Sequence, residues 1–401
     1  MRLSVVSACL ASAMCAGMAV AQAPVAYVYV AEDTSYTNGS VASPITAYAA
    51  SPDGKLTPLP GSPFTQTSGI MYGTNGTHFI TLDENNTSHE YLRVYNVASN
   101  GVIGEEVSKQ DLHEWCGNDG PAEFDHTGQF IYVLESNQCG GGYLSFALSK
   151  SGQLTFKGAT GQTDPLFFTL PTFSGNDKFA YSTVQNPNSQ PPCPTETFFG
   201  MGRESSGALE NISFSETDPA APAGYEVVQA GIVTDDPTNH LASMVYFNDG
   251  PCGQSGESPF ELASYTVQSS GDLVSTNTYE DMPQVDDLGN GQTMKLNAAG
   301  NILAVTTVPG IQFFHFNGAA PITPFTGTGV PADPDNYDYI STLTWDAENH
   351  LYAFDQRSGK LHVYTATTTS VVEAPGSPYT PPNSCAGPNG CAQTLIVRRI
   401  P

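Results

Sequence analysis

Short runs of apolar and β-branched residues recur along the whole chain, separated by turn-forming residues. One run type, represented by YVYVAE at 27–32 and FIYVLES at 130–136, occurs seven times. The runs begin at residues 27, 79, 130, 179, 241, 302 and 351. Runs of this length without sustained helical periodicity predict β-strands, and their repetition predicts a repeat protein.

A second strand type follows each of these runs, as in ITAYAA at 45–50 and LHVYTA at 361–366. Hairpin signals come next, for example DGKL at 53–56 and SGQL at 151–154. Glycine supplies the positive φ that such tight turns require, and the apolar residue after it starts a further strand. A turn such as FDHTGQF at 124–130 precedes the first strand type. Each repeat therefore has four strands, which we call inner, second, third and outer.

Seven four-stranded repeats predict an all-β fold, namely a seven-bladed β-propeller of antiparallel blades. The first repeat begins at its second strand, because no inner strand precedes Tyr27. The unpaired apolar run TLIVRRI at 394–400 is expected to supply that strand. The C-terminal strand would then complete blade 1 and remove the open edge of the ring. We expect residues 22–401 to form this single domain.

The first 21 residues have the anatomy of a secretory signal peptide, with Arg2, an apolar run at 3–18 and small residues at 19–21. We expect cleavage after Ala21 and a secreted or periplasmic protein. No later run reaches the ~20 apolar residues that a membrane-spanning helix needs. Loss of Arg2 leaves 12 basic and 39 acidic residues, which changes the net charge from −26 to −27. This charge favours solubility and excludes nucleic acid and anionic membranes as expected partners.

Six cysteines remain after cleavage, and none forms a Cys-x-x-Cys pair. In an exported chain this pattern predicts disulfides rather than a zinc site. All six are expected on one face of the propeller, here called the top face, which carries the second-to-third loops and the blade-to-blade loops. Proximity on that face predicts three pairs, which are Cys116–Cys139, Cys193–Cys252 and Cys385–Cys391.

Aromatic, amide and acidic residues accompany these cysteines on the predicted top face. His89 lies in one such loop, and His113, Glu114 and Trp115 lie in another. This mixture suits a sugar, another polar small molecule or a protein partner, and it is equally typical of solvated loops. A histidine beside a carboxylate can act as a general base, which makes His113 a candidate catalytic residue. His89 and Trp115 are candidate ligand contacts.

Two acidic runs, VDDLGNG at 285–291 and DPDNYDY at 333–339, offer hard oxygen ligands to Ca²⁺. Neither has the spacing of an EF-hand, and acidic loops are usually only solvated. Apart from calcium, no cofactor is expected. The chain also lacks the Gly-x-Ser-x-Gly, His-Glu-x-x-His and phosphate-loop motifs.

The inner strands are expected to line the central channel. Aligning their turns places Glu123, Thr172, Lys295 and Thr344 at equivalent positions, each followed by an apolar residue. Strand alternation then predicts that these polar residues face the channel while their neighbours pack between blades. Glu123 in blade 3 and Lys295 in blade 6 would face one another nearly across the ring. Such a pair can bind a polar ligand, perform acid–base chemistry or form a structural ion pair.

Four further histidines lie at or beside the repeated turn between inner and second strands: His78, His126, His240 and His350. Their position recurs from blade to blade. We therefore interpret them as residues that build the repeat rather than as site residues.

The repeats AYVYVAE at 26–32, ITAYAASPDGKLTPLPGSPF at 45–64 and FDHTGQFIYVLES at 124–136 resemble seven-bladed propellers of the lactonase-like class. That class includes 6-phosphogluconolactonase-type enzymes, muconate-cyclising enzymes and surface proteins with Tyr-Val-Thr-Asn repeats. The resemblance covers essentially the whole mature chain. It implies lactone hydrolysis, with histidine, arginine and acidic residues around the upper channel. This chain departs from that pattern, because GPAEF at 120–124 lacks a histidine and few arginines survive cleavage: Arg93, Arg203, Arg357, Arg398 and Arg399.

Two functions remain open at this point. One is an exported, monomeric recognition scaffold that binds a glycan, a polar small molecule or a protein on the top face. The other is a lactone hydrolase that uses Glu123, Lys295 or His113 at the upper channel. The scarcity of cations favours the scaffold slightly, and fold alone does not decide between them.

Overall fold

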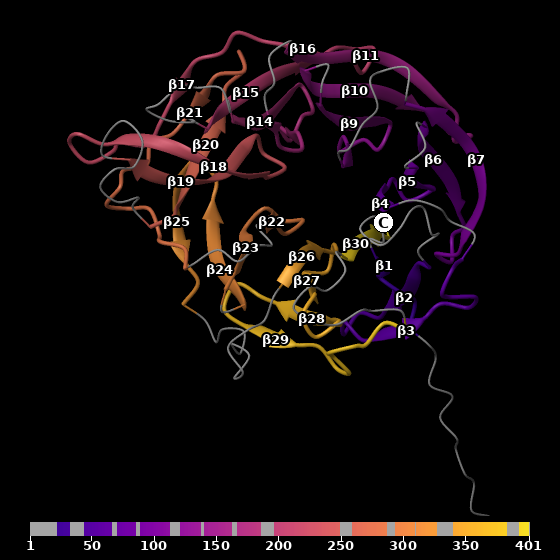
Figure 1. The fold of residues 1–401 in the computed structure, drawn as a ribbon. Helices are drawn as coiled ribbons and strands as arrows, with labels where there is room; N and C mark the ends of the chain where they lie inside the picture. The colour runs from indigo at the N-terminus through magenta and orange to yellow at the C-terminus, as the bar shows by residue number, and fades with distance from the viewer. Residues whose placement is uncertain are drawn as a thin grey trace, which may run out of the picture.

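The structure, a computed structural model, describes residues 22–32, 44–65, 70–85, 89–112, 121–137, 140–162, 167–185, 196–248, 259–286, 293–308, 310–326, 340–382 and 393–400. Over these residues the chain forms seven β-sheets arranged around a central channel (Figure 1). Each sheet has four antiparallel strands from channel to rim, and two of the sheets described carry a fifth strand. The predicted fold, an all-β, seven-bladed propeller, is therefore confirmed. The described residues contain no helix that is long and apolar enough to cross a membrane.

The inner strands of blades 1 to 7 lie nearest the channel, and the second strands pair with them. The inner strands are β30 (Gln393–Arg399), β4 (Ile70–Thr74), β8 (Ala122–Phe124), the pair β12 (Phe167–Phe168) and β13 (Thr172–Phe173), β18 (Glu226–Asp235), β22 (Met294–Leu296) and β26 (Ile340–Trp345). The second strands are β1 (Ala26–Glu32), β5 (His78–Asn85), β9 (Phe130–Asn137), β14 (Phe179–Gln185), β19 (His240–Asn248), β23 (Ile302–Thr307) and β27 (His350–Asp355).

The third and outer strands complete each blade toward the rim. The third strands are β2 (Thr46–Ala50), β6 (His89–Val97), β10 (Gly140–Leu148), β15 (Glu196–Arg203), β20 (Glu261–Val267), β24 (Gly310–Asn317) and β28 (Lys360–Ala366). The outer strands are β3 (Leu56–Pro58), β7 (Ile103–Asp111), β11 (Leu154–Gln162), β16 (Leu209–Asn211), β21 (Leu273–Val274), β25 (Ala320–Pro324) and β29 (Val371–Glu373).

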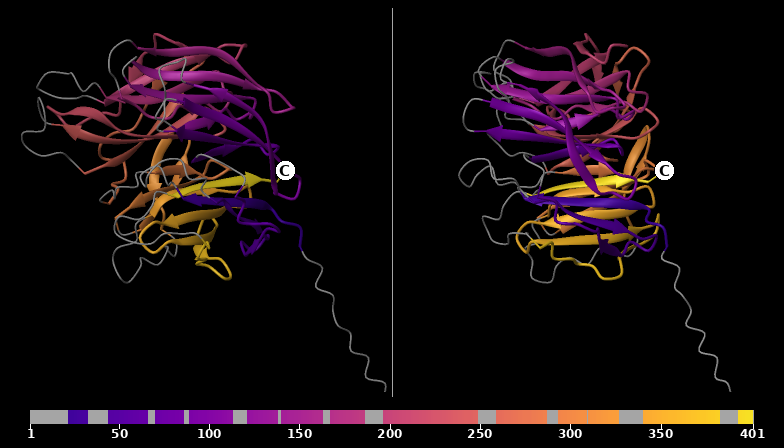
Figure 2. Two further views of the ribbon diagram at one scale, coloured as in Figure 1. Left: turned by 45° about the vertical axis from the view of Figure 1, so that its right-hand side comes forward. Right: turned by 90° about the vertical axis from the view of Figure 1, so that its right-hand side faces the viewer.

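The C-terminal strand closes the ring. β30 pairs with β1 in an antiparallel ladder that runs from Ala26 opposite Arg399 to Glu32 opposite Gln393. Sheet 1 therefore has the order β3-β2-β1-β30, and in Figure 2 the last strand of the chain lies beside the first. The ladder satisfies backbone groups of β1 that would otherwise form an open edge. The predicted closure is confirmed.

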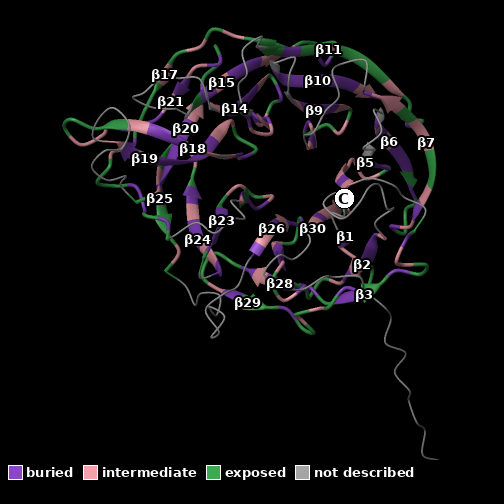
Figure 3. Ribbon diagram, viewed as in Figure 1, coloured by how far each residue is buried: buried purple, intermediate pink, exposed green. Residues whose placement is uncertain are grey.

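The hydrophobic core lies between blades rather than at the centre of the ring. In the described residues each pair of neighbouring blades shares its own cluster of buried side chains, including the pair formed by blades 7 and 1. Strand alternation creates this arrangement, because Val28 and Val30 of β1 pack toward blade 7 while Tyr27 and Tyr29 pack toward blade 2. In Figure 3 exposed residues are frequent on the rim strands β7 and β11.

Blades 4 and 5 depart from the regular pattern. The inner strand of blade 4 is split into β12 and β13, and Pro171 lies just before β13. Proline has no backbone N–H to donate to a ladder, so a strand is interrupted at this position. Blade 5 carries the additional strand β17 (Glu216–Thr217), which pairs in parallel with β21. The residues around β17 account for the long interval between the second strands that begin at 179 and 241.

The short turns between inner and second strands are held by side-chain caps. In blade 3 the Oδ1 atom of Asp125 accepts hydrogen bonds from the backbone N–H groups of Gln129 and Phe130, both at 3.1 Å. In blade 7 Asp346 accepts one from the backbone of His350 at 2.8 Å. These aspartates satisfy turn groups that would otherwise be unpaired, as Asx turns do. They fix the channel ends of the inner strands, which is where the site lies.

Hairpin glycines of one blade pack against rings from the preceding blade. Three of the four turn histidines supply such a ring, since a Cβ atom on the facing glycine would meet the imidazole at 3.0 to 3.3 Å. These pairs are Gly152 with His78, Gly318 with His240 and Gly54 with His350. The interpretation of these three histidines as repeat residues is therefore confirmed.

Substitution of Gly207 is expected to destabilise the protein far more than substitution of Gly224. Both glycines have positive φ, +92° and +89° respectively, so a Cβ atom strains the backbone at both. At Gly207 it would also overlap the ring of Phe130, whereas nothing lies within 4 Å at Gly224. We expect Gly207→Ala to lower the free energy of unfolding by about 3 kcal/mol and Gly224→Ala by about 1 kcal/mol. Urea unfolding measures both values, and equal losses would show that the ring contact is unimportant.

Candidate functional site

A cavity of about 430 Å³ lies in the central channel. Its wall includes the ends of the inner strands and residues of the short turns, among them Gly175, Pro237 and Ala298. The cavity is therefore at the short-turn end of the channel, opposite the predicted top face. A site at the upper end of the channel, as the resemblance implied, is not where this cavity lies.

Four polar residues predicted to face the channel line this cavity together: Glu123, Thr172, Lys295 and Thr344. They occupy equivalent places in β8, β13, β22 and β26, and their apolar neighbours Phe173, Leu296 and Trp345 are buried between blades. Period-two alternation thus aims the polar side chains at the channel. The indole Nε1 of Trp345 also donates to the backbone oxygen of Lys295 at 3.0 Å, which ties blade 7 to the base of this lysine.

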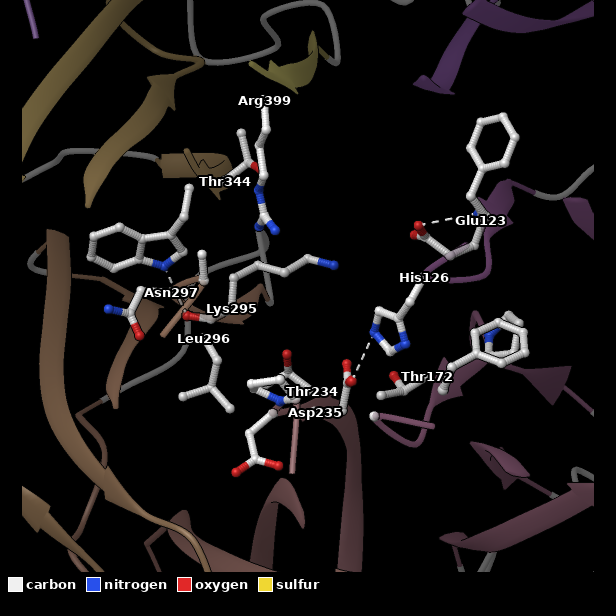
Figure 4. A pocket seen from close by; sticks show the side chains of 18 residues that line it. Glu123, His126, Thr172, Thr234, Asp235, Lys295, Leu296, Asn297, Thr344 and Arg399 are labelled. Carbon is white, nitrogen blue, oxygen red and sulfur yellow. Dashed lines mark hydrogen bonds and ion pairs between the residues drawn. The ribbon is translucent and has the colours of Figure 1, made fainter. Parts of the chain in front are cut away.

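The Glu123 carboxyl group is the acidic centre of the cavity. Its Oε1 atom accepts a long hydrogen bond of 3.3 Å from the backbone N–H of Phe124. Burial raises the pKa of Glu123 above its ordinary value, and the positive charge of Lys295 opposes that rise. Figure 4 shows the Lys295 ammonium extending across the cavity toward this carboxyl group. A carboxylate with a raised pKa and an opposing cation is an arrangement suited to acid–base chemistry.

His126 is a fixed positive charge on the cavity wall. Its Nδ1 atom lies 2.8 Å from Asp177 Oδ1, and its Nε2 atom lies 3.0 Å from Asp235 Oδ2. Hydrogen bonds to these two carboxylates raise the pKa of His126 to about 10. Both ring nitrogens therefore donate at neutral pH, and the imidazolium has no lone pair with which to act as a base. Its interpretation as a repeat residue was wrong, because it lines the cavity.

Arg399, at the end of β30, brings a further positive charge to the cavity. Burial lowers the pKa of its guanidinium, and the carboxylates of Asp346 and Asp235 counteract this effect. With Lys295 and His126, it gives the cavity three cationic side chains in a protein that has only 13 lysines and arginines. The cavity combines this positive charge with the carboxyl groups of Glu123, Asp235 and Asp236.

The remaining predicted site residues are placed elsewhere. His89 begins β6, and the candidates His113 and Trp115 lie outside the described residues. The signal peptide at 1–21 and all six predicted disulfide cysteines also lie outside them: Cys116, Cys139, Cys193, Cys252, Cys385 and Cys391. These assignments stay predictions.

The calcium prediction falls largely outside the described residues as well. Of the two acidic runs, only Val285 and Asp286 are described, and Asp286 accepts a hydrogen bond of 2.5 Å from Gln312 Nε2. Across the described ranges, no group of three or more histidine, cysteine, aspartate or glutamate residues is arranged to hold a metal ion.

The ion pairs of His126 are expected to make part of the stability depend on pH. The folded-state pKa of about 10 exceeds the ordinary value near 6.5, so this contribution is complete below pH 6.5 and disappears as the pH rises toward 10. The His126 side chain is 45% exposed, so solvent screening limits the contribution to about 1–2 kcal/mol. Urea unfolding should show that His126→Gln lowers the free energy of unfolding most near pH 6 and almost not at all near pH 10. A loss of stability that does not change with pH would contradict a stabilising role of these ion pairs.

The sequence matches no protein-family model and no curated protein. The structure is nevertheless similar to several solved propellers. A putative 6-phosphogluconolactonase from Bacteroides uniformis has a TM-score of 0.55 and 12% identity, covering 93% of this chain and 100% of that one. A second putative 6-phosphogluconolactonase, from Bacteroides fragilis, has a TM-score of 0.55 and 10% identity, covering 92% and 98%. The periplasmic gluconolactonase PpgL of Pseudomonas aeruginosa has a TM-score of 0.52 and 11% identity, covering 92% and 99%.

These similarities extend over nearly the whole of both chains, and at this level of identity they concern the fold. The chain is a seven-bladed β-propeller with the fold of the lactonase-like class, as its repeats predicted. Its cavity at the short-turn end of the channel brings the Glu123 carboxyl group together with three cationic side chains.

Proposed function

We propose that the protein hydrolyses a small polar lactone in the channel cavity. The observation that carries this proposal is that Glu123 faces the two cations Lys295 and Arg399 across one cavity of about 430 Å³. A base and cationic groups around one space are what ester hydrolysis requires. The solved neighbours named as gluconolactonases support the choice of a lactone. One of them is named as periplasmic, and this supports our expectation of export through the signal peptide.

The proposed reaction begins with the Glu123 carboxylate taking a proton from a water molecule. The water oxygen forms a bond to the lactone carbonyl carbon, and the carbonyl oxygen becomes an oxyanion. Lys295 and Arg399 stabilise that negative charge, which is greatest at this stage. The ring C–O bond then breaks, and protonated Glu123 returns its proton to the leaving alkoxide. The product is a hydroxy acid, which ionises and releases one proton to solvent.

Thr172 and Thr344 complete the polar wall of the cavity. The Thr172 hydroxyl donates to the backbone oxygen of Val233 at 3.3 Å, which holds it beside blade 5. Hydroxyl groups accept and donate, so they suit the hydroxyls of a sugar-derived ring. His126 is proposed to orient such a ring as a fixed charge, since its protonated ring is unsuited to the role of base.

Replacement of Lys295 is expected to move the acid limb of the pH profile. The positive charge of Lys295 lowers the pKa of Glu123, so Lys295→Met should raise that pKa and shift the acid limb of kcat/KM to higher pH. Loss of one group that stabilises the oxyanion should also lower kcat by about 10²-fold. Lys295→Arg keeps the charge and should keep the limb in place. A limb unchanged in Lys295→Met would show that Glu123 is not the titrating base.

Recognition without turnover is the second candidate function. It is favoured by His126, because an imidazolium whose two N–H groups are both held by aspartates takes up no proton and cannot serve as a base. In this case the same cavity would bind a polar anion, and the predicted top face would remain a separate proposed surface for a glycan or protein.

Proton release from D-glucono-1,5-lactone and other simple lactones separates the two functions. The protein used is residues 22–401, and the spontaneous rate measured without protein is subtracted. Catalysed release supports the lactonase. Calorimetric binding of D-gluconate with no catalysed release of protons from any lactone would leave the recognition function and overturn hydrolysis.

A further inference from the structure

Two consecutive arginines of the closing strand point in opposite directions. The strand alternates, since Leu395 and Val397 join the cluster shared with blade 7 while Ile396 joins the cluster shared with blade 2. By the same alternation Arg398 faces blade 2 and Arg399 faces the channel beside blade 7. Each arginine therefore links β30 to a different part of the ring.

Arg398 packs toward blade 2. Its Nη1 atom donates to the backbone oxygen of Ala98 at 2.6 Å. Its guanidinium also lies over the ring of Tyr27, 5.4 Å from the ring centre. These contacts hold the strand in place without involving the cavity.

Arg399 is different, because its guanidinium forms no hydrogen bond or ion pair with any residue in the described part of the chain. Its guanidinium points into the cavity near Thr344 and Lys295, as Figure 4 shows. A guanidinium group presents five N–H donors in a planar fork that matches a carboxylate. The donors that face the cavity are therefore available to a ligand.

We propose that a carboxylate ligand in the cavity is bound by Arg399 and thereby locks the C-terminal strand, so that occupancy of the site and closure of the ring are coupled. The carboxylate is the product of the reaction proposed above, and the inference rests on that function for the identity of its ligand. Lys295 of blade 6 and Arg399 of blade 1 would hold the same anion from two sides. The ligand then links the closing strand of blade 1 to the inner strand of blade 6, across blade 7.

The coupling follows from reciprocity between binding and opening. Local opening of β30 withdraws Arg399 from the cavity, so the opened protein binds the carboxylate more weakly than the closed protein does. When binding to the opened state is negligible, the ligand lowers the population of that state by a factor of one plus its concentration divided by its dissociation constant. The same contact gives Arg399 a role in affinity although it belongs to the last strand of the chain.

Hydrogen–deuterium exchange of the β30 amides tests this coupling directly. D-gluconate is the probe, and D-glucitol, which has the same carbon chain without the carboxylate, is the control ligand. With gluconate at ten times its dissociation constant, exchange of residues 393–400 should slow about ten-fold, and glucitol should have no effect. Arg399→Gln should lose the protection. Arg398→Gln should speed exchange in the absence of ligand and retain the ten-fold response.

The outcomes separate this inference from the proposed function. Gluconate that binds by calorimetry but leaves β30 exchange unchanged overturns the coupling, and so does equal protection in Arg399→Gln. Failure of gluconate to bind at all also overturns it. Protection of β30 without lactone hydrolysis supports the coupling and contradicts the proposed enzyme activity. Lactone hydrolysis without protection of β30 supports the enzyme activity and overturns the coupling.

Discussion

Replacement of Glu123 by glutamine is expected to lower kcat for lactone hydrolysis by about 10²–10⁴-fold, because the side chain can no longer accept a proton from water. Glutamine is nearly isosteric and removes a carboxyl group whose pKa is raised by partial burial. The folded structure should therefore be retained, and KM should change much less than kcat. Steady-state proton release, together with urea unfolding of the same sample, gives all three quantities.

Glu105→Gln provides the matched control for this experiment. Glu105 is exposed on the rim strand β7, far from the channel wall, and the substitution removes the same charge from the protein. Its kcat should equal that of the wild type. A Glu123→Gln variant with wild-type kcat would preserve the enzyme but discard Glu123 as its base.

Deletion of residues 393–401 is expected to abolish cooperative folding. The strand contributes the buried Leu395 and three partly buried apolar residues, Ile396, Val397 and Ile400. At about 1.5–3 kcal/mol for each fully buried side chain, their loss amounts to about 5 kcal/mol, comparable with the whole stability of many proteins. The deletion also leaves β1 as an open edge, which promotes pairing with other chains. Circular dichroism during urea unfolding and light scattering would report these changes.

A synthetic peptide of residues 393–401 supplied in trans should restore part of the lost stability, since it can re-form the ladder with β1. Arg398→Gln should have a much smaller effect of about 1–2 kcal/mol, because it removes one hydrogen bond and one cation–π contact. A truncated protein with an unchanged urea midpoint would show that the ring is closed by other contacts.

The fold could be predicted from the sequence because its determinants are local and repeated. Hairpin glycines such as Gly207 recur at fixed distances from the strands. The unpaired run at 394–400 matched the one inner strand that was missing, that of blade 1. The irregularities could not be predicted in the same way. Pro171 interrupts an inner strand, and β17 adds to the rim of blade 5, where no equivalent residues exist in the other repeats.

The cavity could be predicted only where one strand determines a side chain's direction. Alternation sufficed to bring together Glu123, Thr172, Lys295 and Thr344. The ion pairs of His126 depend on Asp177 and Asp235 from the next two blades, and no pattern within a single repeat reveals such contacts.

The position of Arg399 in the cavity could have been predicted from the sequence. The run at 394–400 was assigned to the inner position of blade 1, and alternation along such a strand aims every second side chain toward the channel side. Counting from the buried Leu395 places Arg399 on the face opposite to that of Arg398. The end of the channel was harder to predict, because it depends on where the inner strands end rather than on their residue types.

A crystal structure of residues 22–401 with D-gluconate tests most directly whether the channel cavity is the functional site. The expected result is one gluconate at the short-turn end of the channel, with its carboxylate on Arg399 and Lys295 and its C1 carbon facing Glu123. Gluconate bound only on the opposite, loop-rich face, with the channel cavity free of it, would contradict the assignment of the site.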